Sequence, residues 1–477
     1  MFAGWLLATS LPSVRGASPD SGATNRPVSY FRDVRPLLQA NCQGCHQPAK
    51  AKGGYILTDF DHLLQAGDSK ESPIVTNQPD ASLLVKQITP TKGEAEMPKG
   101  KPPLHALEIE KIRTWIAEGA KDDTPPNARQ KYDSEHPPVY TQNPVVTALD
   151  FSPDGTLIAV AGFHEVLLHK ADGSGLVARL VGLSDRIQSL RFSPDGKQLA
   201  VAGGQPGRLG EVQIWEVEKR RLVVSAPVGY DTLYGVNWSP DGKLVSFGCP
   251  DKTVRAIEAS SGKQVLQQGS HNDWVLDTVF STNGSHVISV GRDMSAKLTE
   301  VATQRFVDNI TSITPGALRG GVQSVARHPQ RDEILIGGAD GVPQIYRVFR
   351  KTSRRIGDNA NLIRRFPAME GRVFSVDYSP DGNRVVAAAS LDGHGAVTIY
   401  NAAFDSSLPA NLAQIHEKEV AGQSPEERAA IEKYVTADIS VKATVNFSNA
   451  AVYAVRFSPD GKQIAASGSD GQVRLLD

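Results

Sequence analysis

The sequence predicts two unlike folded parts, an all-α domain followed by an all-β ring of seven four-stranded blades, a β-propeller. Apolar residues recur at helical spacing within residues 18–121. A Ser-Pro-Asp-Gly turn recurs through residues 139–477 at intervals of 41 to 51 residues, with one longer interval of 79, and a period of about 40 to 45 residues is that of a propeller blade. Residues 122–138 are rich in Pro, Asp and Asn and have the composition of a linker. At 477 residues the chain has room for both parts.

Composition and charge exclude several classes of partner. Lys plus Arg number 51 and Asp plus Glu 52, so the formal net charge is −1. A chain without net positive charge offers no broad attraction to polyphosphate, and we expect no nucleic-acid partner. The 40% apolar content is ordinary for a soluble globular protein. No apolar run approaches the roughly 20 residues that a membrane-spanning helix needs, so no transmembrane segment is expected.

Residues 1–17 predict an export signal. An apolar run from Phe2 to Leu11 is followed by small residues that a signal peptidase could cut. The basic residues that usually precede such a run are missing. No cysteine follows the run, so a lipid anchor has no attachment point.

The segment from Asn41 to His46 carries the spacing of covalent c-type heme attachment, Cys-x-x-Cys-His. Residues i, i+3 and i+4 share one face of a helical turn, so the Cys42 and Cys45 thiols and the His46 imidazole are expected to point the same way. The thiols can form thioethers with the heme vinyl groups while the imidazole binds iron. A redox dithiol or half of a zinc site uses the same cysteine spacing. Zinc would need further ligands, and only His46 and His62 are near in sequence.

Predicted amphipathic helices bracket this motif. Pro36 is expected to kink or restart the first helix, and Gly119 to end the second. The apolar positions are Tyr30, Phe31, Val34, Leu37 and Leu38 in the first, and Leu107, Ile109, Ile112, Trp115 and Ile116 in the second. This arrangement resembles a monoheme class I cytochrome c.

That resemblance implies a sixth iron ligand from a loop before the last helix. Met97 lies in such a loop, flanked by residues that cannot continue a helix. A thioether ligand would raise the reduction potential relative to a second imidazole. The competing interpretations are that Met97 fills a gap in the core, or that His62 or His105 takes its place.

The surroundings of the two ligands add two expectations. A proximal histidine usually donates its other ring N–H to an acceptor, and we expect the Pro48 carbonyl to serve. Lysines follow both ligand segments and could steer an acidic redox partner to the heme edge. They could equally belong to an ordinary solvated surface. They are Lys50, Lys52, Lys99 and Lys101.

The repeated turn first occurs at Phe151 to Gly155. Further copies, some degenerate, begin at Phe192, Trp238, Phe280, Arg327, Tyr378 and Phe457. Seven copies predict seven blades. The last copy is followed by only two more strands, so we expect Val139 to Thr141 to supply the missing fourth strand and close the ring. Residues 401–440 are predicted to be an insertion, with a capped helix from Ser424 to Val435.

These blades resemble the WD-repeat family, although only Trp215-Glu216 comes near its namesake dipeptide. The resemblance is specific for architecture and implies a surface that docks a protein partner. Four histidines could ligate a second cofactor, but we expect them in turn networks: His164, His169, His271 and His394. The basic stretch 347–365 is either a solvated face or a surface for an anionic partner. Cys249 is expected to be a small core residue.

Taken together, the two parts resemble planctomycete-type cytochrome c proteins. The resemblance implies heme binding, electron transfer and a location in the periplasm or cell envelope of a bacterium. We therefore expect one covalent heme c and single-electron transfer, with the propeller docking a partner protein, and an electron carrier rather than an enzyme. Two alternatives stay open: an oxidoreductase whose propeller holds substrate or a second cofactor, and a heme-based redox or gas sensor.

Overall fold

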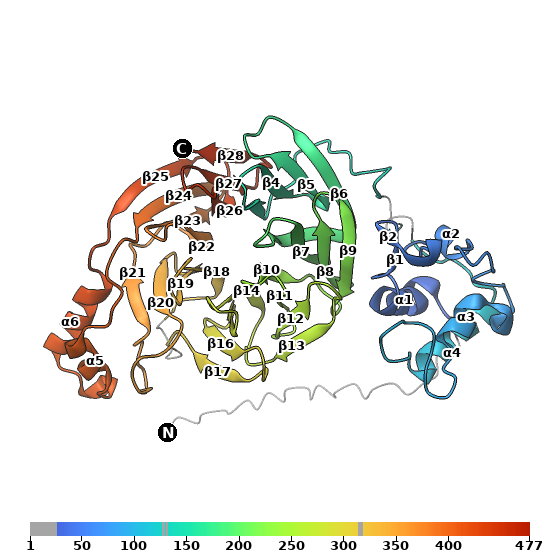
Figure 1. Ribbon diagram of the computed structural model, residues 1–477, viewed down its shortest axis with the longest axis horizontal. Helices are drawn as coiled ribbons and strands as arrows, with labels where there is room; N and C mark the ends of the chain where they lie inside the picture. Colours follow the sequence, from blue (N-terminus) through green and yellow to red (C-terminus); the bar gives the residue numbers. More distant parts are fainter. Residues whose placement is uncertain (1–25, 126–128, 130–131, 313–317) are drawn as a thin grey trace, which may run out of the picture.

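A computed structural model of the chain describes residues 26–125, 129, 132–312 and 318–477. The expected export signal in residues 1–17 lies outside these residues. A helical domain stands beside a ring of sheets, with the helices next to strand β9 (Figure 1). In the portion of the chain that is described, no helix has the length and apolar character to cross a membrane.

The helical domain consists of short helices, loops and one small hairpin. Its elements are a π-helical turn Tyr30–Val34, α1 Arg35–Asn41, β1 His46–Gln47, β2 Lys50–Ala51, a 3₁₀ turn Lys52–Gly54, α2 Phe60–Leu63, a 3₁₀ turn Pro79–Ala81, α3 Leu83–Ile88 and α4 Ala106–Ala117. The Ser29 hydroxyl caps the first turn by accepting the Arg32 N–H at 2.9 Å. Pro36 lies in the first turn of α1, where backbone N–H groups have no partner within the helix, so the missing N–H of proline loses no hydrogen bond. This position confirms the predicted restart of the helix.

Helix α4 supplies one wall of the apolar core of this domain. Ile112, Trp115 and Ile116 are fully buried, and Trp115 lies against Tyr30 with ring centroids 5.4 Å apart. Leu107, expected on the same face, is 80% exposed. It lies in the first turn of α4, beyond the part of the helix that packs against the core.

The ring is built of antiparallel sheets whose strands follow one another in sequence order. Figure 1 shows β10, β14, β18, β22 and β26 innermost around a common centre. The strands are β3 Leu149–Phe151, β4 Leu157–Ala161, β5 Phe163–Lys170, β6 Leu176–Phe192, β7 Gln198–Gln205, β8 Leu209–Glu216, β9 Arg221–Pro227, β10 Tyr234–Trp238, β11 Leu244–Gly248, β12 Val254–Glu258, β13 Gln264–Gln268, β14 Val275–Phe280, β15 His286–Gly291, β16 Ala296–Glu300, β17 Phe306–Asn309, β18 Val322–Arg327, β19 Glu333–Gly338, β20 Gln344–Arg347, β21 Leu362–Arg365, β22 Arg372–Tyr378, β23 Arg384–Leu391, β24 His394–Asn401, β25 Val441–Phe447, β26 Val452–Phe457, β27 Ile464–Gly468 and β28 Val473–Leu476.

Among the described residues the ring contains one seven-stranded sheet, four four-stranded sheets and one three-stranded sheet. The seven-stranded sheet comprises β3 to β9. Its strand β6 has 17 residues and pairs with β5 through its first part and with β7 through its second part. The sheet therefore consists of two groups of four antiparallel strands, β3 to β6 and β6 to β9, that share β6.

The repeated turns form as their chemistry predicts. Ser152 Oγ donates to Asp154 at 2.6 Å and accepts the Leu157 N–H at 2.9 Å, which ties the turn to the next strand. Gly155 has a φ of 71°, which a residue with a side chain rarely adopts. In the degenerate copy, His328 Nδ1 accepts two backbone N–H groups in place of the serine. The other copies also place a glycine at positive φ: Gly196, Gly242, Gly284, Gly382 and Gly461.

The predicted closing strand does not form. The last sheet, β26 to β28, has three strands, and Val139 to Thr141 is not a strand. This segment instead crosses the first sheet, where Tyr140 Oη donates to Glu165 at 2.7 Å and Arg179 donates to the Pro138 carbonyl at 2.6 Å.

Packing between the first and last sheets closes the ring instead. Leu149, Phe151 and Val160 share one apolar cluster with Ala454 and Ala465. The segment just before β3 adds a backbone hydrogen bond, in which the N–H of residue 146 donates to the carbonyl of residue 468 at 3.0 Å. The contact joins segments more than three hundred residues apart in sequence.

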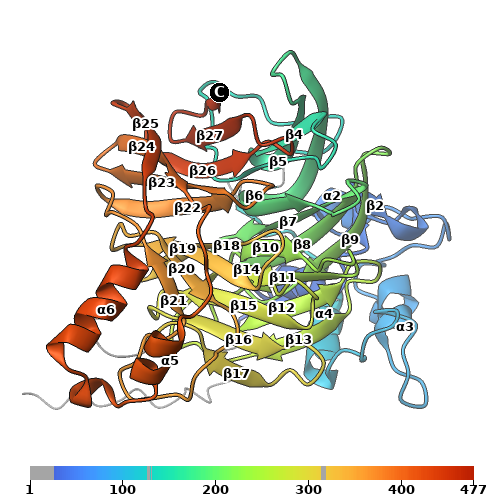
Figure 2. The same cartoon turned by 60° about the vertical axis from the view of Figure 1, so that its left-hand side comes forward.

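The insertion between β24 and β25 forms two helices on the outside of the ring, α5 Ala410–His416 and α6 Pro425–Val435 (Figure 2). Ser424 caps α6 and shares a reciprocal capping box with Glu427, which confirms the predicted start of this helix.

The basic stretch 347–365 holds this insertion in place. Arg347 donates to the Ser406 carbonyl and to the Tyr434 hydroxyl, both at 2.5 Å. The buried Arg364 guanidinium lies 4.2 Å from the ring centroid of Phe404. Arg347 and Arg364 therefore bind other residues of this chain. For these two arginines, the predictions of a solvated face and of a partner surface are both wrong.

Aspartates on β3 and β22 accept backbone N–H groups from other strands of the ring. Asp150 accepts the Phe192 N–H, and Asp377 accepts the Phe457 N–H, each at 2.9 Å. Burial raises the pKa of Asp150 to about 6 and that of Asp377 to about 7. The two carboxyl groups therefore bind a proton more tightly in the folded protein than in the unfolded chain. Their protonation stabilises the folded protein more as the pH falls.

We expect Asp377→Asn to be more stable than the wild type at pH 8, with this advantage shrinking by roughly 1 to 3 kcal/mol towards pH 5. Asparagine can still accept the Phe457 N–H but has no proton to gain. Chemical denaturation of both proteins across this pH range measures the difference between their free energies of unfolding. The titration of groups that both proteins share does not affect this difference. A pH-independent difference would contradict the assignment of the raised pKa to Asp377.

Candidate heme site

The Cys-x-x-Cys-His motif forms a hydrogen-bonded turn directly after α1. The Cys42 N–H closes the helix on the Leu38 carbonyl at 2.8 Å. The N–H groups of Cys45 and His46 then both donate to the Cys42 carbonyl, at 3.0 and 3.2 Å. The motif therefore lies after the helix and leads into β1, and its backbone forms one hydrogen-bonded turn that contains all three residues.

The imidazole of His46 is oriented by a backbone carbonyl. Its Nδ1 lies 3.2 Å from the Tyr55 carbonyl oxygen, and the two rings meet edge to face. The prediction of Pro48 as acceptor is wrong, because β1 and β2 form a hairpin that turns at Pro48 and brings Tyr55 back against the imidazole. Such a contact on Nδ1 is the usual way in which a histidine that binds a metal through its other ring nitrogen is oriented. Burial lowers the pKa of His46, which favours the neutral form that a ligand needs.

The two thiols lie in unlike surroundings. Cys42 packs against the apolar core of the helical domain, and burial raises its pKa to about 12. Such a thiol is protonated at neutral pH, which does not suit a redox dithiol. Cys42 and Cys45 are not joined to each other. Within the described parts of the chain, no three His, Cys, Asp or Glu side chains are placed to hold a metal ion.

Met97 lies in the loop between α3 and α4. Its N–H donates to the Gln87 carbonyl at 2.9 Å, and its half-buried side chain packs against the same apolar cluster as Cys42. The competing histidines are exposed and engaged elsewhere. His62 Nδ1 lies 2.8 Å from Asp59, and His105 forms the N-terminal cap of α4.

The four lysines near the ligands are not equivalent. Lys50 Nζ donates to the Val223 carbonyl of strand β9 at 2.5 Å and is half-buried, so it faces the propeller. Lys52, Lys99 and Lys101 are exposed. The structure therefore leaves only these three free to meet a partner.

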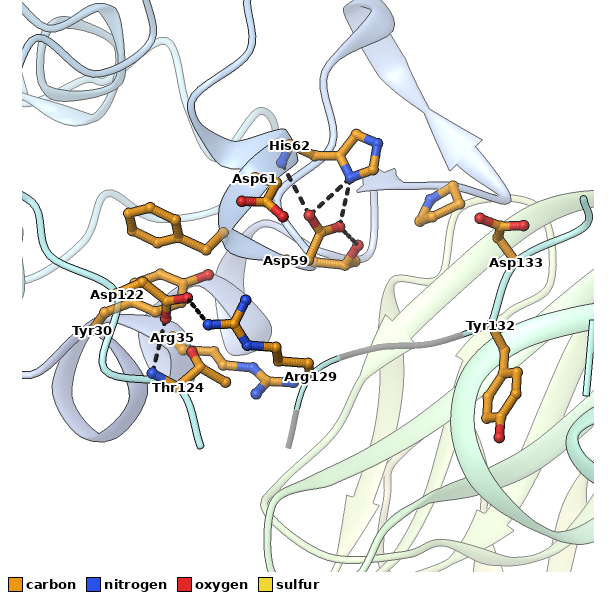
Figure 3. A pocket seen from close by; sticks show the side chains of 13 residues that line it. Tyr30, Arg35, Asp59, Asp61, His62, Asp122, Thr124, Arg129, Tyr132 and Asp133 are labelled. Atoms are coloured by element: carbon orange, nitrogen blue, oxygen red, sulfur yellow. Dashed lines mark hydrogen bonds and ion pairs between the residues drawn. The ribbon is translucent and has the colours of Figure 1, made fainter. Parts of the chain in front are cut away.

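A cavity of about 250 Å³ lies between the helical domain and the linker (Figure 3). Tyr30, Arg35 and His62 of the helical domain line it together with Tyr132 and Asp133 of the linker. None of the four predicted heme ligands lines this cavity. The residues that line this cavity come from segments far apart in sequence, so no sequence motif predicts the cavity.

A helical domain whose first helix leads into Cys-x-x-Cys-His, beside a ring of four-stranded sheets, defines a class of two-domain protein: a cytochrome c domain with a propeller. The comparisons agree. Residues 42–100 match the family model for planctomycete cytochrome C. The model of the WD domain, G-beta repeat, matches residues 135–165, 262–299, 360–396 and 441–477. The chain therefore joins a planctomycete cytochrome c domain to a WD-repeat propeller, and the first of these domains implies heme.

Curated relatives match parts of the chain. Eukaryotic translation initiation factor 3 subunit I of Danio rerio is 24% identical over 170 residues, 36% of this chain and 46% of that protein. Nuclear distribution protein nudF 2 of Talaromyces marneffei is 30% identical over 110 residues, 21% of this chain and 24% of that protein. Coronin-7 of Mus musculus is 26% identical over 188 residues, 36% of this chain and 20% of that protein. The chain thus spans less than half the length of these relatives.

Proposed function

We propose that this protein is a monoheme c-type cytochrome that transfers single electrons and uses its propeller to dock a partner protein. In this proposal Cys42 and Cys45 form the thioethers, His46 is the proximal ligand and Met97 the distal ligand. The observation that carries it is the His46 imidazole, whose Nδ1 is held by the Tyr55 carbonyl, in one turn with two free thiols. A heme held there supplies one-electron chemistry between ferrous and ferric iron.

The chain's own residues define what such a site would do. The Tyr55 carbonyl orients the His46 ring, and Cys42 and Met97 pack against the same apolar cluster. Met97 is favoured over the histidines because it contacts this cluster, whereas His62 and His105 are exposed. A heme held by both His46 and Met97 would leave no ligand position for a substrate, which supports an electron carrier.

The propeller and the exposed lysines supply the proposed partner contacts. WD repeats are associated with protein–protein interaction, and Lys52, Lys99 and Lys101 suit an acidic redox partner. The sheet from β3 to β9 supports a ring of seven blades, since it counts as two blades that share β6. Covalent heme attachment in bacteria occurs outside the cytoplasm, which supports a periplasmic or envelope location.

An absorption spectrum of the full chain, exported together with heme-maturation machinery, tests the proposal. We expect one low-spin six-coordinate heme per chain that survives acid-acetone extraction. A second chromophore would instead favour an oxidoreductase, and ready carbon monoxide binding to a five-coordinate heme would favour a sensor. A protein without covalently bound heme would refute all three.

A further inference from the structure

The heme-attachment loop rests directly on the propeller. Strand β9 is the outer strand of its sheet and lies beside α1 and β2 (Figure 1). A Cβ atom added to Gly44 would lie 2.5 Å from the Ser225 carbonyl oxygen and 3.1 Å from Pro227 Cδ. The Lys50 ammonium donates to the Val223 carbonyl of the same strand. The loop between the two cysteines thus contacts the backbone of β9 without intervening space.

Further contacts define how the two domains sit against each other. The Phe31 ring has two guanidinium groups near it, that of Arg35 of its own domain at 5.6 Å and that of Arg208 of the propeller at 5.2 Å. Ala49, in the β1–β2 turn, packs against an apolar core cluster of the propeller. The helical turn, the cysteine loop and the hairpin all meet the same sheet, so the docking has a single orientation.

A buried carboxylate lies behind β9. Glu211 on β8 is fully buried, and its Oε2 accepts from Ser184 Oγ at 2.8 Å and from Gln213 Nε2 at 2.7 Å. Its Oε1 accepts from Ser225 Oγ. The Trp215 indole donates to Gln213 Oε1 at 2.8 Å, which turns the amide nitrogen towards Glu211. Each of the three partners of Glu211 carries a group that can donate a hydrogen bond to a carboxylate oxygen.

The same residue, Ser225, therefore contacts the heme-attachment loop through its carbonyl and Glu211 through its hydroxyl. We propose that β9 sets the reduction potential of the cytochrome domain, because it fixes the Glu211 carboxylate behind Gly44 and the Lys50 ammonium in front of the strand. This inference rests on the proposed heme function. Fixed charges in a site shielded from water act more strongly than exposed ones, and salt screens them less.

Removing the carboxylate is the direct test. In the full heme-loaded chain, Glu211→Gln is expected to raise the midpoint potential, because a negative charge that stabilises the ferric state is lost. Glu165→Gln is the matched control, since Glu165 is equally buried but contacts Tyr140 and Arg179 instead of the loop. An unchanged potential in Glu211→Gln, with its full complement of heme, would overturn the proposal.

Lys50→Met provides a second variant with the opposite sign. The substitution keeps most of the aliphatic stem and removes the charge from a half-buried surface position, so folding is not at risk. We expect a lower midpoint potential, with a difference from the wild type that shrinks as salt increases. The Glu211→Gln shift should persist in salt because that group is fully buried. A potential in Lys50→Met equal to the wild type at low salt would contradict the role of the ammonium.

The contact itself can be tested without heme. The backbone of Gly44 is not in the left-handed region, so alanine can adopt the same local conformation. The added methyl group in Gly44→Ala therefore disturbs only the contact with β9. We expect faster hydrogen exchange in residues 221–227 and 43–52 of the heme-free chain. Gly175→Ala, whose added methyl meets open space, is the matched control. Unchanged exchange in Gly44→Ala would refute the docking, whereas a wild type that never acquires covalent heme would refute the proposed function alone.

Discussion

Replacing Cys42 and Cys45 together with alanine is expected to abolish covalent heme attachment. The two thiols sit in one turn with His46, and no other described cysteine lies near them, so nothing can replace the thioethers. After export with heme-maturation machinery, the variant should carry no heme that survives acid-acetone extraction, whereas the wild type should carry one per chain. Each single replacement should leave at most one thioether, visible as a shifted absorption of the reduced pyridine adduct.

Cys249→Ala is the matched control for this experiment. Cys249 is 2% exposed and packs in an apolar cluster of the propeller, so its loss should affect stability and not heme content. Covalent heme in the double variant would show that the thioethers form elsewhere. Loss of heme in Cys249→Ala with the fold intact would contradict the assignment of the attachment site to the helical domain.

Replacing Met97 with alanine is expected to remove the methionine-to-iron charge-transfer band of the oxidised protein and to lower the reduction potential. A thioether stabilises ferrous iron relative to water or imidazole, and axial ligands span a range of about 0.8 V. The potential should therefore fall by a substantial part of that range. The vacated position should also let carbon monoxide bind to the reduced protein.

Met294→Ala is the control, because Met294 is an exposed propeller residue. If Met97→Ala keeps the spectrum and potential of the wild type, Met97 is a core residue only. Loss of the sixth ligand in His62→Ala or His105→Ala would then identify the alternative, although both histidines are exposed in the structure.

Local chemistry made much of this molecule predictable. The restart of α1 at Pro36, the capping box of Ser424 and Glu427, and the glycine turns of the repeats each depend on residues close in sequence. Hydrogen bonds within a few residues decide these features, so the sequence alone suffices. The same holds for the heme-attachment motif, whose three side chains lie within one turn.

The wrong expectations concern long-range placement. Val139 to Thr141 has a composition that allows a strand, yet the position of the helical domain beside β9 draws the linker across the first sheet. The arginines of residues 347–365 were expected on the surface, but the inserted segment between β24 and β25 supplies partners for them, among them Phe404 and Tyr434. In both cases the deciding neighbour is distant along the chain and leaves no local signal.

By itself, the sequence determined the two-part organisation, the repeat and the Cys-x-x-Cys-His motif, because periodicity and spacing are local properties. Only the tertiary structure decided which carbonyl orients His46, how the ring closes, and that the heme-attachment loop rests on β9 in front of Glu211. These features join residues that meet only when separately folded units pack together. These contacts are stabilised by shape complementarity and by hydrogen bonds between residues far apart in the chain, and the order of residues in the sequence does not show which of them meet.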